Sequence, residues 1–420
     1  MSKPCPGKPR GTFSKKWPEQ PVMKLLMVTH YFDSHPGGIE FVAREIFRRL
    51  ARPECEVTWA AADVSRLPET SAHGRSLPLA TWNGVEEATG VPFPVPKPGA
   101  IKKLWSEVKK SDVLLLHDCL YLSNIVAFLF ARIRCKPVVI IQHTGELTSS
   151  NVVVNAMMQL GKATIARHML RSSGQVVFIS RNTQFYFRSL RFSRTPLLIF
   201  NGVDTDIFAP PEDDAARATL RKAFGLPADC RVVLFVGRFV TAKGLPILEE
   251  MARSAPELTW TFAGAGPLDP QDWDLPNVKV FSGLYGHSLA RLYGVADVFV
   301  LPSEREGFPL VVQEALACGV PVVCSDEAAR ADDALAPFVR MVPLVAADGR
   351  KQQAKDFLRV ICQTLQKMPD HAAADRRFQF VKSRYSWSHV ADMYYETISE
   401  LASGPRANRS SNSEAETWQR

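Results

Sequence analysis

Short apolar runs that alternate with amphipathic stretches occur in two series along this chain. The first series includes MKLLMVTHYF, CEVTWAAAD, SDVLLLHD, KPVVIIQHTGE, SSGQVVFIS and TPLLIFNGVD. The second series includes RVVLFVGR, LTWTFAGAG, NVKVFSG, ADVFVLPS and VPVVCSD. Buried strands that alternate with helices form mostly parallel sheets covered by helices on both faces. The pattern therefore predicts two doubly wound, Rossmann-like α/β domains, the number that 420 residues favour.

We expect the boundary between the domains just after Asp206, where a polar, alanine-rich stretch separates the two series. The proline-rich stretch 65–99 is expected to form loop and short elements, and a helix is expected over 181–190 after SSGQVVFIS. The last periodic segment, SWSHVADMYYETISELA, is predicted to form an amphipathic helix. The expected units are a disordered basic tail (1–21), a first domain (22–206), a second domain (207–385), the last helix (386–403) and a disordered polar tail (404–420). Two such domains imply a central cleft, and ligands bind at the carboxyl ends of the strands.

The formal net charge of +8 favours anionic partners, but part of it lies in a tail: residues 1–16 hold five basic residues and no acidic one. Only this charge and the tail favour a nucleic-acid partner, so we expect none. The eight cysteines include no C-x-x-C pair, which favours reduced, buried thiols over disulfides or a zinc site. No secretory signal and no apolar run of about 18 residues is present, so we expect a cytoplasmic protein without a membrane span.

Glycines and cations follow two of the predicted strands. Gly37 and Gly38 come after the first strand, where they let a ligand approach the backbone, although a plain tight turn uses the same residues. Arg238 and Lys243 follow VVLFVG, the latter near the start of the next helix. Two cations at a strand–helix turn suit a diphosphate, and two solvated surface charges are the alternative.

Glycine-containing turns follow two further strands of the second series. FAGAGP contains Gly266, and FSGLYGH contains Leu284 between two glycines. Both turns suit a backbone that passes close to a flat ligand such as a nucleobase. Simple loop glycines are the alternative.

The stretch EREGFPLVVQEALACGVPVV places one carboxylate before a helix and another inside it. Pro309 suits the first helical turn, so Glu306 lies in the preceding loop and Glu314 on the helix, which Gly319 and Pro321 end. Glu306 can accept hydrogen bonds from sugar hydroxyls, and Glu314 can hold a ribose diol unless it is a surface charge. Free backbone N–H groups are predicted at Gly307, Phe308 and Leu310.

The stretch EGFPLVVQEALACGVPVV resembles the E-x7-E signature of retaining nucleotide-sugar glycosyltransferases of the group 1 family, which have the GT-B fold. Six other stretches resemble motifs of the same family, in the same order along the chain. They are GGIE, NGVDTDIF, FVGRFVTAKG, FAGAGPL, ADVFVLPSEREGF and YSWSHVADMYYETI. The last of these resembles the closing helix that crosses back to the first domain.

The resemblance implies a role for each candidate residue. The donor diphosphate would be bound by Arg238 and Lys243, helped by Gly38; the donor sugar by Glu306; the ribose by Glu314; and the base by the backbone near Leu284. His143, after VVIIQ, matches the polar residue close to the transferred sugar. The acceptor would lie on the first domain, but 65–99 contains no family landmark.

The implied reaction is a retaining, metal-independent hexosyl transfer from a nucleotide diphosphate sugar to a hydroxyl of a saccharide or lipid-linked acceptor, in polysaccharide or glycolipid synthesis. No metal and no cofactor is expected, because the cations would stabilise the leaving diphosphate. A nucleotide-sugar epimerase and a non-catalytic nucleotide-sugar-binding protein are the alternatives. A dinucleotide oxidoreductase is disfavoured, because no G-x-G-x-x-G with its acidic partner is present.

The stretch AIKKLWSEVKK suggests a contact with an anionic membrane. Ile101, Leu104, Trp105 and Val108 recur at helical spacing, and lysines surround them. A basic amphipathic helix with tryptophan suits the inner face of a membrane. An ordinary surface helix packed on the core has the same periodicity and is the alternative.

Overall fold

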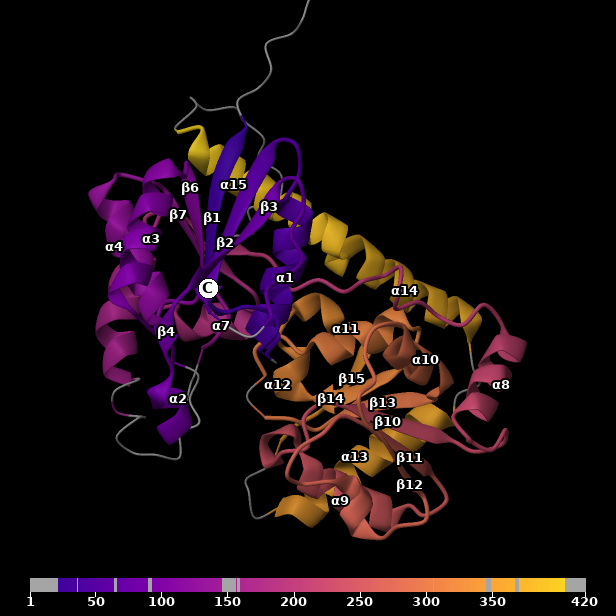
Figure 1. Cartoon of the computed structure of the whole chain (residues 1–420). Coiled ribbons are helices and arrows are strands. Elements are labelled where there is room, and N and C mark those ends of the chain that lie inside the picture. The colour runs from indigo at the N-terminus through magenta and orange to yellow at the C-terminus, as the bar shows by residue number, and fades with distance from the viewer. Residues whose placement is uncertain are drawn as a thin grey trace, which may run out of the picture.

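The computed structural model describes residues 22–404, except 36, 64–65, 90–92, 146–155, 157–158, 305, 345–348 and 367–369. The tails predicted over 1–21 and 404–420 lie outside these residues, apart from Gly404. The described chain forms two α/β units, and each is built on its own parallel sheet (Figure 1). The predicted fold class is therefore confirmed.

The first unit is a seven-stranded parallel sheet in the order β3-β2-β1-β6-β7-β8-β9. Its strands are β1 (Met23–Tyr31), β2 (Cys55–Ala62), β3 (Gly74–Leu79), β6 (Val113–His117), β7 (Val138–Gln142), β8 (Gln175–Phe178) and β9 (Leu197–Leu198). Alternate residues point to opposite faces of a strand. Leu25 and Met27 accordingly join the hydrophobic cluster under α1, whereas Leu26 and Val28 join the one under α3 and α4.

Helices cover both faces of this sheet (Figure 1). They are α1 (Gly38–Leu50), α3 (Pro98–Lys110), α4 (Leu122–Ile133), α6 (Arg167–Ser172), preceded by a π-helix (Lys162–Ala166), and α7 (Arg181–Tyr186). A two-stranded hairpin of β4 (Thr81–Trp82) and β5 (Val95–Pro96), with α2 (Gly84–Thr89) between its strands, extends from the same unit. No helix within the described ranges is both long and apolar enough to cross a bilayer.

The second unit is a six-stranded parallel sheet in the order β12-β11-β10-β13-β14-β15. Its strands are β10 (Val232–Val236), β11 (Thr259–Ala263), β12 (Val278–Phe281), β13 (Val298–Leu301), β14 (Val322–Ser325) and β15 (Val339–Val342). Its α-helices are α8 (Asp214–Ala223), α9 (Leu245–Ser254), α10 (His287–Val295), α11 (Leu310–Ala317), α12 (Asp326–Ala329), α13 (Arg350–Leu365) and α14 (His371–Tyr385).

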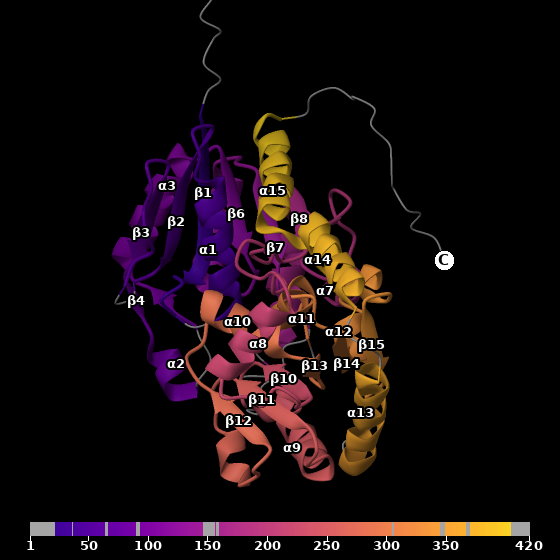
Figure 2. The same cartoon turned by 90° about the vertical axis from the view of Figure 1, so that its right-hand side faces the viewer.

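The chain crosses between the units twice, and the two crossings lie side by side. The Val203 N–H donates to Tyr385 O at 2.7 Å, and the Trp387 N–H donates to Val203 O at 3.2 Å. Gly202 lies against the indole of Trp387, because a Cβ at that glycine would be 2.4 Å from the ring. After the second crossing, α15 (Trp387–Ala402) returns to the first unit and packs on α1 (Figure 2). The predicted closing helix is confirmed.

Three local predictions differ from the structure. The proline-rich stretch 65–99, expected as loop and short elements, contributes β3 to the main sheet. Pro78 is tolerated there because β3 is an edge strand, where a missing N–H breaks no ladder. Pro309 is the N-cap of α11 and not a residue of its first turn. The helix expected after SSGQVVFIS ends at Tyr186, a turn earlier than the sequence suggested.

Candidate functional site

The segment that carries both predicted carboxylates ends abruptly at the C-terminus of α11. Gly319 adopts the left-handed conformation, with φ of +74°. Its N–H donates to Leu316 O at 3.0 Å, and the Val320 N–H donates to Ala315 O at 2.9 Å. This pair of bonds is a Schellman motif, which satisfies the last carbonyls of a helix. The motif turns the chain directly into β14 and fixes α11 against the sheet.

Lys243 and Glu306 form an ion pair at the carboxyl ends of β10 and β13. The Lys243 Nζ lies 2.5 Å from the Glu306 Oε1, and the two side chains are 26% and 9% exposed. Gly244 follows in the left-handed conformation, and a Cβ there would be 2.4 Å from Pro302 O. The turn carrying Lys243 therefore packs directly on the strand end that leads to Glu306. Lys243 and Glu306 were predicted to bind different parts of a donor, and in the structure they form an ion pair with each other.

Arg238 lies in the same loop as Lys243. It follows Gly237, which has φ of +154°, at the end of β10. The Arg238 side chain is exposed, and within the part of the chain described it makes no hydrogen bond or ion pair. A ligand phosphate at this loop would meet a cation that no carboxylate competes for.

Glu314 lies on α11, where its Oε2 accepts a hydrogen bond of 2.9 Å from the hydroxyl of Tyr293 on α10. Desolvation raises the pKa of Glu314 to about 7, and the Tyr293 hydrogen bond opposes this shift. The carboxyl is thus close to half protonated at neutral pH. Ligand hydroxyls that donate to it would favour the carboxylate form.

His143 directly follows β7 and lies at the boundary between the two units. A Cβ on Gly307 would be 3.3 Å from His143 O and 4.0 Å from the Ile179 Cδ1. The glycine therefore lets the loop after β13 approach the first unit closely. Across the same boundary, the Asn182 side chain donates to Glu306 O at 3.3 Å. The structure thus brings His143, Lys243 and Glu306 into one region.

The Phe308 side chain packs in the hydrophobic core. The ring is 7% exposed and stacks on Phe200 at 5.2 Å and against Tyr385 at 5.6 Å, between ring centroids. Leu310 begins α11 and is half-buried against the same cluster. The ligand role predicted for these two residues therefore rests on their backbone N–H groups.

Two residues that the sequence reasoning missed hold His143 in place. His117 is the last residue of β6, the neighbour of β7, and Asp118 follows it. The His117 Nδ1 lies 3.0 Å from the His143 Nε2, and the two rings stack with centroids 5.1 Å apart. Burial lowers the pKa of His143 to about 3 and that of His117 well below its usual value. Both imidazoles are therefore neutral at physiological pH.

Asp118 fixes the backbone that follows β7. Its Oδ1 accepts from the His143 N–H at 3.2 Å, the Thr144 hydroxyl at 3.2 Å and the Gln142 amide at 2.5 Å. Burial raises the pKa of Asp118 to about 7, against the opposing effect of these donors. The signal for both residues was available in the sequence, because HD directly follows the apolar run of SDVLLLHD.

The two glycines of the first loop, Gly37 and Gly38, have different surroundings. A Cβ on Gly37 would overlap the Glu40 carboxylate, 2.1 Å from Oε2, whereas a Cβ on Gly38 would meet no atom within 4 Å. Glu40 is 3% exposed, and its Oε1 lies 2.8 Å from the His30 Nε2 and 3.6 Å from the His35 Nδ1. The buried carboxylate therefore holds the loop, and Gly38 leaves room for a ligand.

The proline-rich stretch contributes a further polar group near the first strand. The Tyr31 hydroxyl donates to the Glu86 carboxylate, and the His35 Nε2 lies 3.0 Å from the other Glu86 oxygen. The rings of Tyr31 and His35 stack with centroids 4.3 Å apart. Glu86 lies on α2, which the sequence did not predict. These side chains line the first unit next to the glycine loop, where an acceptor was expected.

The predicted base-binding turns have close backbone packing. A Cβ on Gly266 would be 2.5 Å from Phe239 O, so this glycine is needed for the contact between two loops of the second unit. Leu284 is half-buried against the core, and the neighbouring Tyr285 is 81% exposed. The turn after β12 therefore presents an aromatic ring to solvent beside Leu284.

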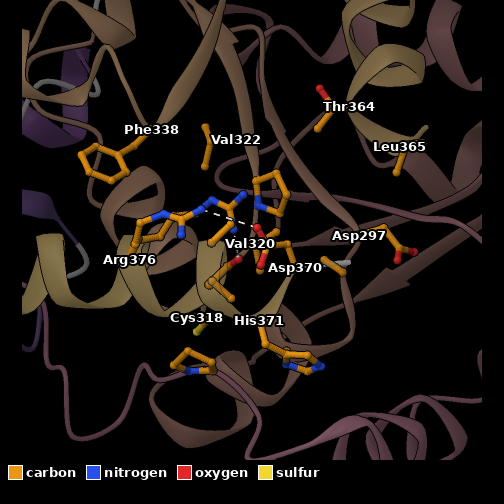
Figure 3. A pocket seen from close by; sticks show the side chains of 18 of the residues that line it. Asp297, Cys318, Val320, Val322, Phe338, Thr364, Leu365, Asp370, His371 and Arg376 are labelled. Carbon is orange, nitrogen blue, oxygen red and sulfur yellow. Dashed lines mark hydrogen bonds and ion pairs between the residues drawn. The ribbon is translucent and has the colours of Figure 1, made fainter. Parts of the chain in front are cut away.

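A separate pocket lies away from these residues (Figure 3). It has a volume of about 700 Å³ and lies beside the amino end of α14 and the starts of β14 and β15. Several of its cations have partners: Arg217 lies 2.9 Å from Asp297, Arg376 lies 3.5 Å from Asp370, and Arg377 donates to a backbone carbonyl. None of the predicted site residues lines it. Because ligands of doubly wound sheets bind at the carboxyl ends of strands, we place the site in the region of His143, Lys243 and Glu306.

Among the residues that the structure describes, no group of three or more His, Cys, Asp and Glu side chains is arranged to hold a metal ion. The polar groups of the candidate site suit other ligands. Arg238 and Lys243 suit phosphate oxygens, and Glu306 and Glu314 suit hydroxyls.

Solved structures with the same fold cover most of the chain. Sucrose-phosphate synthase from Thermosynechococcus elongatus superposes with a TM-score of 0.69 at 19% identity, over 91% of this chain and 100% of that one. HepE from Anabaena in complex with UDP and glucose superposes with a TM-score of 0.64 at 17% identity, over 90% and 100%. At these identities the similarity shows the fold alone.

Curated relatives match parts of the chain. The D-inositol 3-phosphate glycosyltransferase of Mycolicibacterium smegmatis is 31% identical over 228 residues, which are 50% of this chain and 48% of the relative. A GDP-mannose-dependent alpha-(1-6)-phosphatidylinositol monomannoside mannosyltransferase of the same organism is 36% identical over 183 residues, 38% and 47% of the two chains. The chain thus spans about half the length of these curated relatives.

Two family models match successive parts of the sequence. Residues 36–207 match Glycosyltransferase Family 4, and residues 216–342 match Glycosyl transferases group 1. The first match covers most of the seven-stranded unit, and the second covers all six strands of the other. With both units matched, and with relatives that are themselves glycosyltransferases, this chain belongs to the group 1 glycosyltransferases.

Proposed function

We propose that this protein transfers a sugar from a nucleotide diphosphate sugar to a hydroxyl of a saccharide or lipid-linked acceptor, in glycolipid or cell-surface polysaccharide synthesis. The observation that carries the proposal is the Lys243–Glu306 pair, which lies at strand ends of one unit, next to Gly307, where that unit packs against the backbone of His143 in the other. The names of the relatives support this class of substrates, since one is a GDP-mannose-dependent mannosyltransferase acting on a phosphatidylinositol monomannoside.

The ion pair supplies a mechanism for donor binding. A diphosphate placed between Arg238 and Lys243 gives the Lys243 ammonium a second anionic partner. The Glu306 carboxylate is then free to accept hydrogen bonds from the hydroxyls of the donor sugar. As the glycosidic bond breaks, negative charge grows on the leaving diphosphate, and two fixed cations stabilise it more than they stabilise the bound donor.

We propose retention of configuration at the anomeric carbon. The acceptor hydroxyl attacks an oxocarbenium-like carbon from the face that the diphosphate leaves, and its proton passes to the departing phosphate oxygen. Glu306 is engaged by Lys243 and by sugar hydroxyls, which fits binding better than covalent attack. Because Arg238 and Lys243 provide the charge stabilisation, we expect turnover to persist in EDTA.

A thermal-shift screen of UDP-, GDP-, ADP- and TDP-sugars tests the proposal, because a ligand that binds the native state raises the melting temperature. Product analysis with the stabilising sugar then separates the alternatives. A new sugar nucleotide from donor alone indicates an epimerase. Stabilisation without any product, in the presence of lipid and saccharide acceptors, indicates a binding protein. No stabilisation by any of the four sugars contradicts the proposal.

Contact with the inner face of an anionic membrane is a separate proposal. The helix singled out in the sequence, α3, buries Leu104 and Val108 in the core, so its apolar face is not free. On the adjacent α4, however, Leu129 is 52% and Ile133 is 67% exposed, and the lysines of α3 are exposed as well. We expect co-sedimentation with liposomes to increase with their content of anionic lipid. Binding that does not depend on the anionic-lipid content, or that persists in the double variant L129S/I133S, contradicts the proposal.

A further inference from the structure

We infer that His117 is a positioning residue for the transfer reaction: it donates its Nδ1–H to the Nε2 of His143 and so fixes the tautomer in which His143 presents Nδ1–H to the cleft. The inference rests on the proposed function for its consequence in catalysis. The hydrogen-bond direction itself can be tested in the free protein.

The two facing nitrogens of His117 and His143 share one proton. The His117 Nδ1 and the His143 Nε2 are 3.0 Å apart, which is a hydrogen bond. Both rings are buried, with 0% of His117 and 6% of His143 exposed, and burial lowers the pKa of both. Two neutral imidazoles joined in this way allow only two arrangements, because one nitrogen must donate and the other must accept.

The surroundings of His117 decide between the two arrangements. The His117 Nε2 is sealed from solvent, and none of the residues that the structure describes offers it a hydrogen-bond partner. If His143 were the donor, this Nε2 would have to carry a proton that no acceptor meets. If His117 is the donor, the Nε2 is an unpaired acceptor, which native proteins tolerate more readily than an unpaired N–H. The proton therefore belongs on the His117 Nδ1.

The other ring nitrogen of His143, Nδ1, makes no hydrogen bond within the described residues, and it is not sealed from solvent as the His117 Nε2 is. It is a hydrogen-bond donor once its Nε2 accepts from His117. Asp118 holds the backbone of His143 and Thr144 from the same strand end, so the ring is fixed at two points. Gly307 lies against this backbone from the second unit.

The chemical consequence is a defined role for His143. A neutral imidazole that presents N–H can donate to an oxygen of the bound sugar. It cannot accept the proton of an acceptor hydroxyl at that nitrogen, so it does not act as the general base. This agrees with a reaction in which the departing phosphate takes the proton.

NMR of the free full-length protein labelled with 15N-histidine tests the hydrogen-bond direction. Long-range proton–nitrogen correlations distinguish protonated from bare ring nitrogens, and H117N and H143N assign the two rings. We expect His143 to carry its proton on Nδ1 in the wild type and in H117N, because the Asn amide N–H replaces the Nδ1 donor. In H117L the donor is lost and the tautomer should change. A wild-type His143 protonated on Nε2 overturns the inference.

Kinetics with the donor found in the thermal-shift screen test the functional part. We expect H117L to lower kcat on the order of ten- to a hundredfold, with the donor KM changed less than about threefold, and H117N to keep most of the wild-type kcat. At His143, Asn places an N–H near the Nδ1 position and Gln places one near Nε2. H143N should therefore retain more activity than H143Q. Equal losses in H117N and H117L, or in H143N and H143Q, contradict a positioning role.

The two tests separate failure of the inference from failure of the proposed function. If no nucleotide sugar is turned over, the proposed function fails, and the NMR result still decides the direction of the hydrogen bond. If turnover is found but the tautomer is reversed, only the inference fails. A purely structural role for His117 would lower the melting temperature of both variants and leave the tautomer and kcat unchanged.

Discussion

Two predicted donor-site glycines should respond in opposite ways to the same substitution, Gly266→Ala and Gly38→Ala. A Cβ on Gly266 would be 2.5 Å from Phe239 O and 2.8 Å from the Phe239 N and C. This backbone cannot shift freely, since the Phe239 O accepts from Leu268 N–H at 3.0 Å and the Phe239 N–H donates to Ala265 O at 2.9 Å. A Cβ on Gly38 would meet no atom within 4 Å.

The expected magnitudes follow from these distances. Extra atoms in a well-packed site destabilise by about 1–3 kcal/mol, and 1 kcal/mol lowers the melting temperature of a domain of about 150–250 residues by about 2–4 °C. We therefore expect G266A to melt about 2–12 °C below the wild type. In G38A the melting temperature should stay the same or rise slightly, because alanine favours the first turn of α1.

Thermal unfolding with and without the nucleotide sugar from the screen reads both effects in one assay. We expect G266A to keep most of the ligand-induced stabilisation and G38A to lose it, because its methyl group occupies the open side of the loop. If G266A melts like the wild type but no longer responds to ligand, that glycine serves the ligand and not the packing. A full ligand response in G38A would remove Gly38 from the donor site.

Three further predictions concern the charged and titrating groups. K243A should lower kcat on the order of a hundredfold or more while the fold stays intact. The control K222A, on the exposed face of α8, should keep the wild-type kcat. Equal activity of the two variants would show that Lys243 has no role in the mechanism. Burial raises the pKa of Asp118 from 3.8 to about 7, so between these pH values the native state holds a proton that the unfolded chain has released. The stability associated with this proton is at most about 4 kcal/mol. It is fully present below pH 3.8 and is lost as the pH rises through 7. Urea unfolding between pH 4 and 8 should show a smaller decline for D118N than for the wild type, and identical slopes would refute the assignment. Y293F removes the hydrogen bond that opposes the raised pKa of Glu314, so the donor KM should rise and its increase toward low pH should begin at a higher pH than in the wild type. An unchanged KM profile would show that Glu314 does not contact the donor.

Most of the fold could be predicted from the sequence, because strand and helix periodicities are local properties. Six apolar runs predicted strands of the first sheet, but the edge strand β3 escaped, since GRSLPL is short, half-buried and contains Pro78. Gly319 marked the end of α11 correctly, because a left-handed C-terminal residue is a requirement of the backbone itself.

The candidate site was only partly accessible to the same reasoning. Lys243 and Glu306 were predicted as ligand-binding residues, but their pairing joins positions 63 residues apart and depends on how two strand ends meet. Which glycines face a neighbouring backbone and which face open space also depends on tertiary contacts, as Gly38 and Gly266 show. His117 was visible as a polar residue after a buried strand, yet only the neighbouring strand reveals that it meets His143.

The paired crossings between the two units limit how the units can move. If one sheet slid past the other, the chain segments that connect Val203 and Tyr385 to the two sheets would be strained. The same sliding would break the hydrogen bonds between the two crossings. Rotation about a line through these residues leaves both connections at constant length. Such a rotation changes the distance between His143 and Lys243, because these residues follow strands of different units and do not lie at the crossings. We therefore expect the separation of these two residues to be set mainly by one angle.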